Sequence, residues 1–200
     1  MKEEVMTMGN ETEIEFKNLL TIEEYKRALA FIGKSTSDAI KQVNTYFDHP
    51  TVPLKQKKQA FRLRQKADHC ELTFKEAIST TVSNETNVTI SENEASIILS
   101  QGYVNTRDYP EFLHLPERLD CVGSLETHRL EVEFHGGLLV LDHSIYGQTE
   151  DFEVEYETTN ELEGQVIFDS FLQDVNIPAR PTDKKIARFY NEMKRMAERT

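Results

Sequence analysis

Charged and apolar side chains alternate in several segments of this chain, and two of these segments are rich in carboxylates. In Glu13-Ile14-Glu15-Phe16-Lys17, the glutamates and the lysine lie on one side of an extended strand, because successive side chains point to opposite faces. Glu153 and Glu155 repeat this arrangement opposite Phe152 and Val154. Mg²⁺ and Mn²⁺ prefer oxygen ligands, so such paired carboxylates suit a divalent metal.

Basic side chains take the same kind of position in other segments. Arg62 and Arg64 share one face of a predicted strand, and Lys75 and Arg129 lie on the polar faces of two further alternating segments. A guanidinium can bind phosphate oxygens through two parallel hydrogen bonds, whereas an ammonium acts as a point charge. Together with the carboxylates, these residues favour a binding site for a polyanion. The basic groups would bind the polyanion directly, and a metal ion would bridge it to the glutamates.

The same alternation is also typical of an ordinary antiparallel sheet with one buried and one solvated face. Under that interpretation, Arg62 and Arg64 would form exposed ion pairs with glutamates, and such pairs contribute little to stability. We favour a sheet that closes into a barrel with a charged interior and with helices packed outside. A small barrel of this kind can hold one ligand.

The elements that must position these residues are strands and capped helices. Thr21 with Glu24, and Ser91 with Glu94, have the spacing of capping boxes, and Gly33 and Gly102 are expected to end the two helices. The other expected strands are 11–20, 43–47, 61–65, 71–75, 128–134, 137–141 and 152–157. The other expected helices are 161–173 and a last one from Thr182 onward, after Pro178 and Pro181; residues 103–116 are expected to be irregular.

Length and composition narrow the class of protein. The 200 residues suit one α+β domain at 11–200, preceded by a flexible N-terminal tail at 1–10. The net charge of −12 disfavours a nucleic-acid partner, because neutralising phosphates needs clustered basic residues. No apolar run approaches the about 18 residues of a membrane span, so no membrane partner is expected. Two cysteines without CxxC spacing suit a reducing cytoplasm.

Taken in order, these segments resemble the CYTH superfamily, also called the triphosphate tunnel metalloenzymes. Glu13-Ile14-Glu15-Phe16-Lys17 is similar to the ExExK motif of that family, and Lys185-Ile186-Ala187-Arg188-Phe189 is similar to a basic motif near the family's C-terminus. Between them, the resemblance runs through Arg62-Leu63-Arg64, the strand of Lys75, Arg129 and the pair Glu153 and Glu155. It spans residues 11–189, nearly the whole chain.

The resemblance implies an eight-stranded antiparallel tunnel that binds a triphosphate together with Mg²⁺ or Mn²⁺. By this resemblance, the metal-linked carboxylates would be Glu13, Glu15, Glu153, Glu155 and Asp142. The residues in contact with phosphate oxygens would be Lys17, Arg62, Arg64, Lys75, Arg129, Lys185 and Arg188. Lys17 or Lys185 would assist the attacking water if its pKa were lowered, and the choice between Lys184 and Lys185 stays open.

We therefore expect metal-dependent hydrolysis of a small-molecule triphosphate, with inorganic triphosphate favoured. The chain has no Trp that could serve as an aromatic platform for thiamine or adenine. Alternatives are a thiamine triphosphatase, a class IV-type adenylyl cyclase, and a module that binds triphosphate or polyphosphate without turnover. A purely structural sheet protein is the fourth alternative. The sequence leaves the oligomeric state open.

Overall fold

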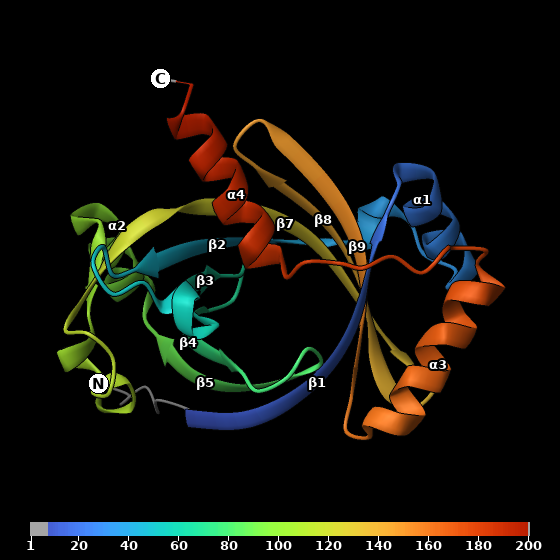
Figure 1. Ribbon diagram of the computed structural model, residues 1–200, viewed down its shortest axis with the longest axis horizontal. Coiled ribbons are helices and arrows are strands. Elements are labelled where there is room, and N and C mark those ends of the chain that lie inside the picture. The colour runs from blue at the N-terminus through green and yellow to red at the C-terminus, as the bar shows by residue number, and fades with distance from the viewer. Residues whose placement is uncertain (1–7, 200) are drawn as a thin grey trace. The chain divides into compact units, whose positions relative to one another are not determined.

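Nine antiparallel strands form one sheet in the computed structural model, which describes residues 8–199. Their order is β2-β3-β4-β5-β1-β9-β8-β7-β6, and β2 also pairs with β7. Because of this additional pairing, eight strands close on themselves, and β6 is attached to β7 (Figure 1). The α+β fold with an eight-stranded antiparallel barrel is thereby confirmed. Of the predicted tail, residues 1–7 lie outside the described part, whereas residues 8–10 belong to β1.

The chain divides into two compact units. Unit 1 comprises the residues up to Thr12 together with Val43–Ser124, and unit 2 comprises Glu13–Gln42 together with the residues from Leu125 onward. Three long strands contribute residues to both units: β1 (Met8–Leu20), β2 (Ile40–Asp48) and β7 (Arg118–Phe134).

Unit 1 contains a meander of strands and one α-helix. Its remaining elements are β3 (Gln59–Gln65), β4 (Cys70–Ala77), β5 (Val82–Ile90), α2 (Glu92–Gln101), β6 (Tyr103–Asn105) and short 3₁₀ turns at Leu54–Lys57, Thr106–Asp108 and Pro110–Phe112. In the β3–β4 pair, Phe61 lies opposite Phe74 and Leu63 opposite Leu72. These apolar side chains pack with Phe112 and residues of α2 in one buried cluster. Arg62 and Arg64 therefore lie on the other face of the strands.

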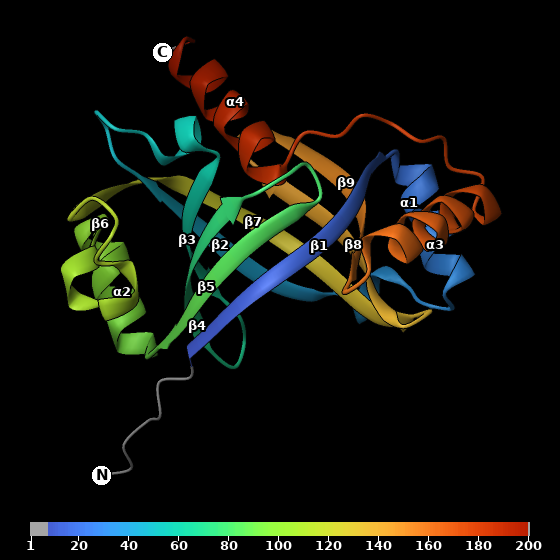
Figure 2. The same cartoon turned by 60° about the horizontal axis from the view of Figure 1, so that its bottom comes forward.

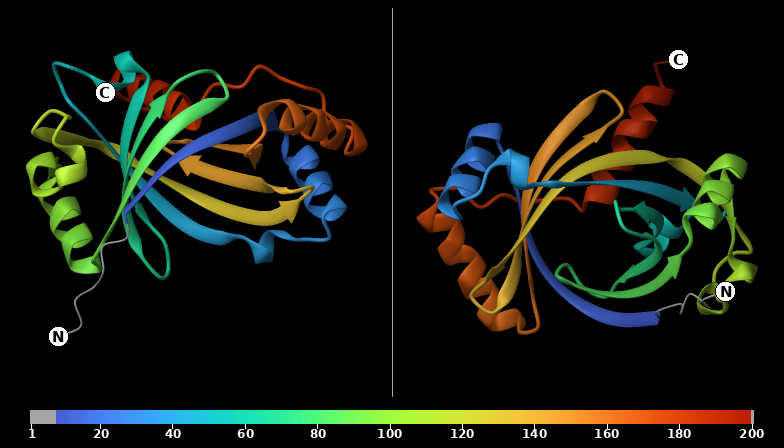
Figure 3. Two further views of the ribbon diagram at one scale, coloured as in Figure 1. Left: turned by 90° about the horizontal axis from the view of Figure 1, so that it is seen from below. Right: turned by 180° about the vertical axis from the view of Figure 1, so that it is seen from behind.

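Unit 2 repeats this layering. Its remaining elements are α1 (Ile22–Phe31), a 3₁₀ turn at Thr36–Asp38, β8 (Gly137–Tyr146), β9 (Thr149–Thr158), α3 (Glu161–Asp174) and α4 (Lys185–Ala197). Phe16, Leu141 and Val154 pack against α1 and α3 in a second buried cluster. Figures 2 and 3 show α1 and α3 side by side, where the rings of Phe31 and Phe171 are 5.7 Å apart. Burial of each such side chain stabilises the fold by roughly 1.5–3 kcal/mol.

The predicted helix boundaries are confirmed where a local cap defines them. Thr21 with Glu24, and Ser91 with Glu94, form complete capping boxes at the starts of α1 and α2. Gly102 ends α2 in the left-handed conformation, with φ of 74°. Such a conformation favours glycine because it has no Cβ to clash with the preceding turn.

The last helix begins at Lys185 rather than at Thr182, because the preceding segment is tied to β1 and α1. Arg180 donates hydrogen bonds to the Glu24 carboxylate and to the Leu19 carbonyl. The Thr182 hydroxyl accepts a hydrogen bond from the Leu19 amide at 3.0 Å. These contacts hold Thr182 in a non-helical segment, so α4 starts three residues later.

One strand lies in a segment for which the sequence analysis predicted no element, and one expectation was wrong in detail. The segment Val82–Ile90 is strand β5, although its Ser, Asn and Thr residues are not typical of a strand. Its register with β4 is continuous, so cross-strand pairing outweighs the weak local preference. Residues 103–116 contain β6 and two 3₁₀ turns rather than irregular chain alone. None of the helices within residues 8–199 is long and apolar enough to cross a bilayer.

Candidate functional site

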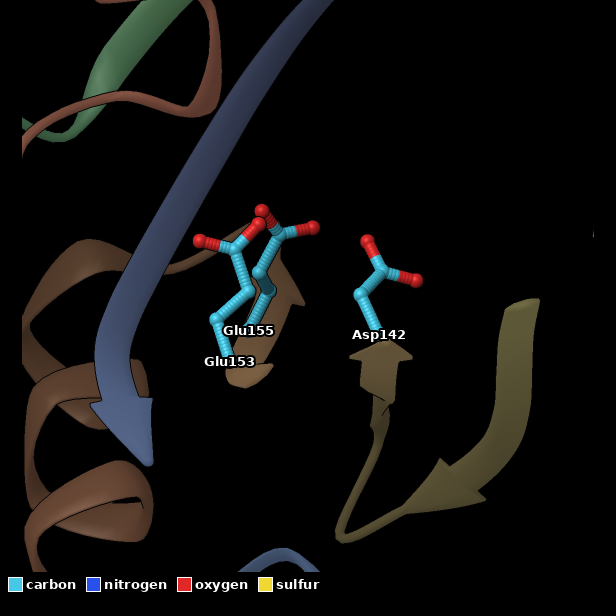
Figure 4. Close-up of side chains that lie close together, drawn as sticks. All are labelled: Asp142, Glu153 and Glu155. Atoms are coloured by element: carbon cyan, nitrogen blue, oxygen red, sulfur yellow. The ribbon is translucent and has the colours of Figure 1, made fainter. Parts of the chain in front are cut away.

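Three buried carboxylates from two neighbouring strands of unit 2 lie close together. Asp142 on β8 is the direct cross-strand partner of Glu153 on β9, and Glu155 follows on the same face two residues later. Each of the three can offer one oxygen atom within 4.8 Å of the others. Figure 4 shows their side chains extending from the two strands in the same direction. We call these three residues the carboxylate cluster.

Arg129 on β7 neutralises part of this charge from the next strand. It is the cross-strand partner of Asp142, so three polar residues lie in a row across β7, β8 and β9. Its Nε donates to Asp142 Oδ1 at 2.9 Å, and its Nη2 donates to Asp142 Oδ2 at 2.6 Å and to Glu155 Oε2 at 3.0 Å. Such two-point guanidinium contacts fix geometry as well as charge.

The first turn of α4 supplies two further cations. The Lys185 ammonium forms an ion pair with Asp142 Oδ2 and lies 2.7 Å from Glu153 Oε1 and 4.0 Å from Glu155 Oε1. Arg188, one helical turn later, donates to Glu153 Oε2 at 2.7 Å and to Asp151 Oδ2 at 2.8 Å. The structure therefore brings Lys185 to the carboxylate cluster.

The ExExK segment approaches the same cluster from β1. Lys17 lies opposite Glu155 in the β1–β9 pairing, and its ammonium is 3.6 Å from Glu155 Oε1. It also forms an ion pair with Glu15. Among the described residues, the cluster of three carboxylates does not include Glu13 or Glu15. Their assignment as metal ligands stays a prediction.

Burial and the neighbouring cations shift the pKa values of the three carboxylates in different directions. Burial raises the pKa of Asp142, but Arg129 and Lys185 outweigh it and hold that pKa below its ordinary value. Burial likewise opposes ionisation of Glu155, and Lys185, Lys17 and Arg129 hold its pKa well below the usual range. For Glu153, burial together with the nearby Glu155 charge keeps the pKa raised. Two of the three groups are thus held ionised.

Glu157 is the next residue on this face and behaves differently. Burial raises its pKa to about 7, and repulsion from Glu13, Glu155 and Glu15 acts in the same direction, against the attraction of Arg129. Glu157 lies outside the motifs that the sequence analysis matched. The alternation of Glu153, Glu155 and Glu157 places it on the charged face, but alternation alone does not indicate its burial.

The donor set of the carboxylate cluster fits a divalent metal. Its ligand atoms are carboxylate oxygens, which Mg²⁺ and Mn²⁺ prefer. Glu153 Oε1 is buried and accepts no hydrogen bond of suitable geometry among the described residues, although Lys185 Nζ is near it. Because this carboxylate oxygen accepts no such hydrogen bond from the described residues, it is available as a ligand for a metal ion.

The predicted phosphate-binding residues Arg62, Arg64 and Lys75 lie on one face of β3 and β4 in unit 1. Lys75 Nζ is 2.9 Å from Glu85 Oε1 on β5, and Arg62 Nη2 is 3.9 Å from Glu85 Oε2. Arg64 Nε donates to Asn44 Oδ1 at 3.0 Å. We call Arg62, Arg64 and Lys75 the basic cluster.

Glu85 is the carboxylate that the sequence analysis missed in unit 1. Burial raises its pKa, but Arg62 and Lys75 outweigh this and lower the pKa to about 2. Glu85 is therefore an ionised counter-ion of Arg62 and Lys75 at neutral pH. It could not be found because β5 was not predicted. The face of β3 and β4 keeps an excess of basic groups over Glu71 and Glu85, which suits an anion.

Asp151 is the missed carboxylate of unit 2. It holds Arg188 through two hydrogen bonds, at 2.8 and 3.1 Å, and accepts another from the Tyr146 hydroxyl at 2.5 Å. Asp151 also lies on the face of Glu153 and Glu155 by alternation, so the pattern could have been extended one step toward the N-terminus.

Comparisons with known proteins identify relatives along nearly the whole chain. A family model of the CYTH domain matches residues 11–190. A Bacillus subtilis protein named "Putative triphosphatase YjbK" is 39% identical over 191 residues, which cover 94% of this chain and 99% of that protein. A Bacillus halodurans crystal structure described as "a putative adenylate cyclase" is 34% identical, with a TM-score of 0.81, over 91% of this chain and 99% of that one.

A more distant solved structure supports the fold alone. It is a Hippeastrum protein that is 21% identical, with a TM-score of 0.69, over 90% of this chain and 95% of that one. The resemblance to the CYTH superfamily, drawn from the order of the motifs, is thereby confirmed.

Proposed function

We propose that this chain, which belongs to the CYTH domain family, is a divalent-metal-dependent hydrolase of triphosphates, with inorganic triphosphate as its substrate. The observation that carries the proposal is the buried cluster of Asp142, Glu153 and Glu155 in a member of this family. Burying three carboxylates together with their cations still costs desolvation free energy, and such clusters are common at functional sites. The name of the Bacillus subtilis relative supports the same activity.

The residues have distinct roles under this proposal. Asp142, Glu153 and Glu155 would hold the metal, with Glu13 and Glu15 as further carboxylates along β1. When bound, the metal would neutralise phosphate charge and activate water. Arg62, Arg64, Lys75 and Arg129 would bind phosphate oxygens and stabilise the charge of the transition state, which is most of what phosphoryl transfer asks of a protein.

Lys17 and Lys185 would act as fixed charges rather than as bases. Burial lowers the pKa of each lysine, but the surrounding carboxylates outweigh burial and raise it above the ordinary value. A lysine that stays protonated cannot accept a proton from water, so the expected assistance through a lowered pKa loses its support. Both ammonium groups can still attract a polyanion and offset its charge.

Phosphate release from inorganic triphosphate tests the proposal. We expect release with Mg²⁺ or Mn²⁺, little release with EDTA, and a loss of about a hundredfold or more for Glu155→Gln, because one ligand and one charge disappear. Glu133→Gln is the matched control, since Glu133 is an exposed glutamate outside the carboxylate cluster. Absence of release with either metal would contradict the proposal.

A second candidate is the conversion of ATP to cyclic AMP and pyrophosphate. The description of the 34% identical Bacillus halodurans structure favours it. Both reactions use the triphosphate portion of the substrate, so the shared residues do not separate them. Product analysis with ATP does: a cyclase yields cyclic AMP with pyrophosphate, whereas a triphosphatase yields phosphate. Recovery of intact triphosphate after tight, metal-dependent binding would instead indicate a binding module.

Three further proposals concern the domain bounds, the cellular compartment and the partner of the protein. We take residues 11–200 as one domain, because the family match extends over 11–190. We place the protein in the cytoplasm, because both Cys70 and Cys121 are free thiols. Its partner would be the small-molecule triphosphate itself.

A further inference from the structure

The first turn of helix α4 lacks the acidic residues and the side-chain cap that usually stabilise the start of a helix. Acidic residues occupy the first turns of α1, α2 and α3, and each of these helices has a side-chain cap. The first turn of α4 has no acidic residue, and its N-cap, Lys184, makes no capping hydrogen bond. Lys185 and Arg188 place two positive charges at the positive end of the helix dipole, where cations are unfavourable. Their compensation comes from the carboxylates of β8 and β9.

The rest of α4 packs beside the β8–β9 hairpin. Figure 1 shows the helix next to this hairpin, where the rings of Tyr146 and Phe189 are 6.1 Å apart. Phe189 is fully buried. Lys185 and Arg188 join the N-terminal half of α4 to the carboxylates of β8 and β9. The first turn of α4 is therefore in direct contact with the carboxylate cluster.

Cations already compensate most of the carboxylate charge around the cluster without a metal. Four cations meet six carboxylates in the described ion pairs of this face; the cations are Lys17, Arg129, Lys185 and Arg188, and the carboxylates are Glu15, Glu131, Asp142, Asp151, Glu153 and Glu155. A divalent ion at the carboxylate cluster would have to share carboxylate oxygens that already contact the Lys185 ammonium. Like charges at contact distance in a partly buried site repel strongly.

We propose that the Lys185 ammonium is a built-in counter-ion that competes with a divalent metal for Asp142 and Glu153, and so couples metal binding to the docking of α4. This inference rests on the metal site of the proposed function. Lys185 is the cation to be displaced, because its ammonium lies within ion-pair distance of all three carboxylates in the cluster, whereas Arg129 pairs with two. Arg129 belongs to a strand that pairs with β8, whereas Lys185 lies in the first turn of a terminal helix.

A triphosphate would give the Lys185 ammonium new anionic partners in place of the carboxylates that the metal takes. Once Lys185 has left Asp142 and Glu153, its ammonium has no equivalent partner among these carboxylates, but phosphate oxygens would provide one. Metal alone should therefore loosen the first turn of α4, and metal with triphosphate should hold it again. The two ligands would then bind with positive cooperativity, because each lowers the cost of the other.

Calorimetric titration with Mn²⁺ alone tests the competition. We expect Lys185→Met to bind Mn²⁺ about tenfold more tightly than wild type, or better, because the competing charge is gone. Lys194→Met is the matched control, since Lys194 lies on the same helix, has a side chain that is 78% exposed and pairs with Glu198 at 3.8 Å; its affinity should equal that of wild type. Unchanged or weaker Mn²⁺ binding by Lys185→Met would overturn the inference.

A second measurement uses the wild-type chain, in case Lys185→Met is poorly folded. Backbone hydrogen exchange over residues 185–190 should become faster when Mn²⁺ is added and slower again when a non-hydrolysable imido analogue of triphosphate follows. Exchange that slows with Mn²⁺ alone, or does not change, would overturn the inference. Neither measurement depends on turnover, so failure here is distinguishable from failure of the proposed hydrolysis, which phosphate release decides.

Discussion

The basic cluster of unit 1 and the carboxylate cluster of unit 2 are built by the same device and compensated in different ways. In each, the apolar halves of antiparallel strands pack beneath helices and leave the charged halves on the other face. Glu85, the counter-ion of the basic cluster, stands on a neighbouring strand. Two of the counter-ions of the carboxylate cluster, Lys185 and Arg188, stand on a terminal helix. Charges on a sheet are fixed by its pairing, whereas charges on a helix can leave with it.

The largest expected effect separates the two clusters by function. Asp142→Asn should raise the Mn²⁺ concentration needed for half-maximal activity by at least about 100-fold, because a charged ligand is lost. Arg64→Gln should instead raise KM for triphosphate and leave the metal requirement unchanged. Steady-state kinetics over both concentrations measure the two effects. If each variant changes the Mn²⁺ requirement and the KM for triphosphate equally, the two clusters do not bind metal and phosphate separately.

A smaller effect concerns the stability that the sheet-bound counter-ion provides. Lys75→Met should lower the free energy of unfolding by about 2 kcal/mol, because it leaves the largely buried Glu85 with less compensation. Urea unfolding at pH 7 measures this change. The stabilisation by Glu85 is present above its unfolded pKa near 4.5 and declines as the pH falls toward 2, since its folded pKa is the lower one.

Lys41→Met provides the control for that measurement. Lys41 pairs with Glu126 at 2.6 Å, but its side chain is 59% exposed. Exposed ion pairs of this kind contribute roughly 0–1 kcal/mol, so the free energy of unfolding should change little. An equal loss for Lys41→Met and Lys75→Met would show that burial does not distinguish the two pairs.

The smallest expected effect is the pH dependence that Glu157 gives to unit 2. Its folded pKa of about 7 lies above the ordinary value of 4.5, so the folded protein binds the proton more tightly than the unfolded chain. Stability should therefore fall as the pH rises from 4.5 to 7. We expect wild type to lose about 1–2 kcal/mol over this range relative to Glu157→Gln. Parallel stability curves for the two proteins would refute the assignment.

The sequence predicted those parts of the fold that short-range rules determine. The capping boxes at Thr21 and Ser91 need only residues three positions apart, and the alternation around Glu15, Arg64 and Glu155 needs only a period of two. These rules identified which charged residues share a strand face. The order of the motifs then supplied the family and the closed sheet.

What remained beyond prediction depends on contacts distant in the sequence. Strand β5 exists because β4 pairs with it, and Glu85 was missed with it. The start of α4 is set by the hydrogen bond between Thr182 and Leu19, so the sequence could not decide between Lys184 and Lys185. The meeting of Asp142 with Glu153 depends on the register of β8 and β9, which alternation within one strand does not determine.

The attachment of Arg180 and Thr182 to β1 and α1 limits how far α4 could travel if it left the carboxylates. Only Asp183 and Lys184 lie between Thr182 and the helix, and two residues span at most about 7 Å. A displaced helix would therefore stay close to its present position. Its lysine would stay at a high effective concentration near its old partners, so departure and return would be local and rapid rather than a search through solvent.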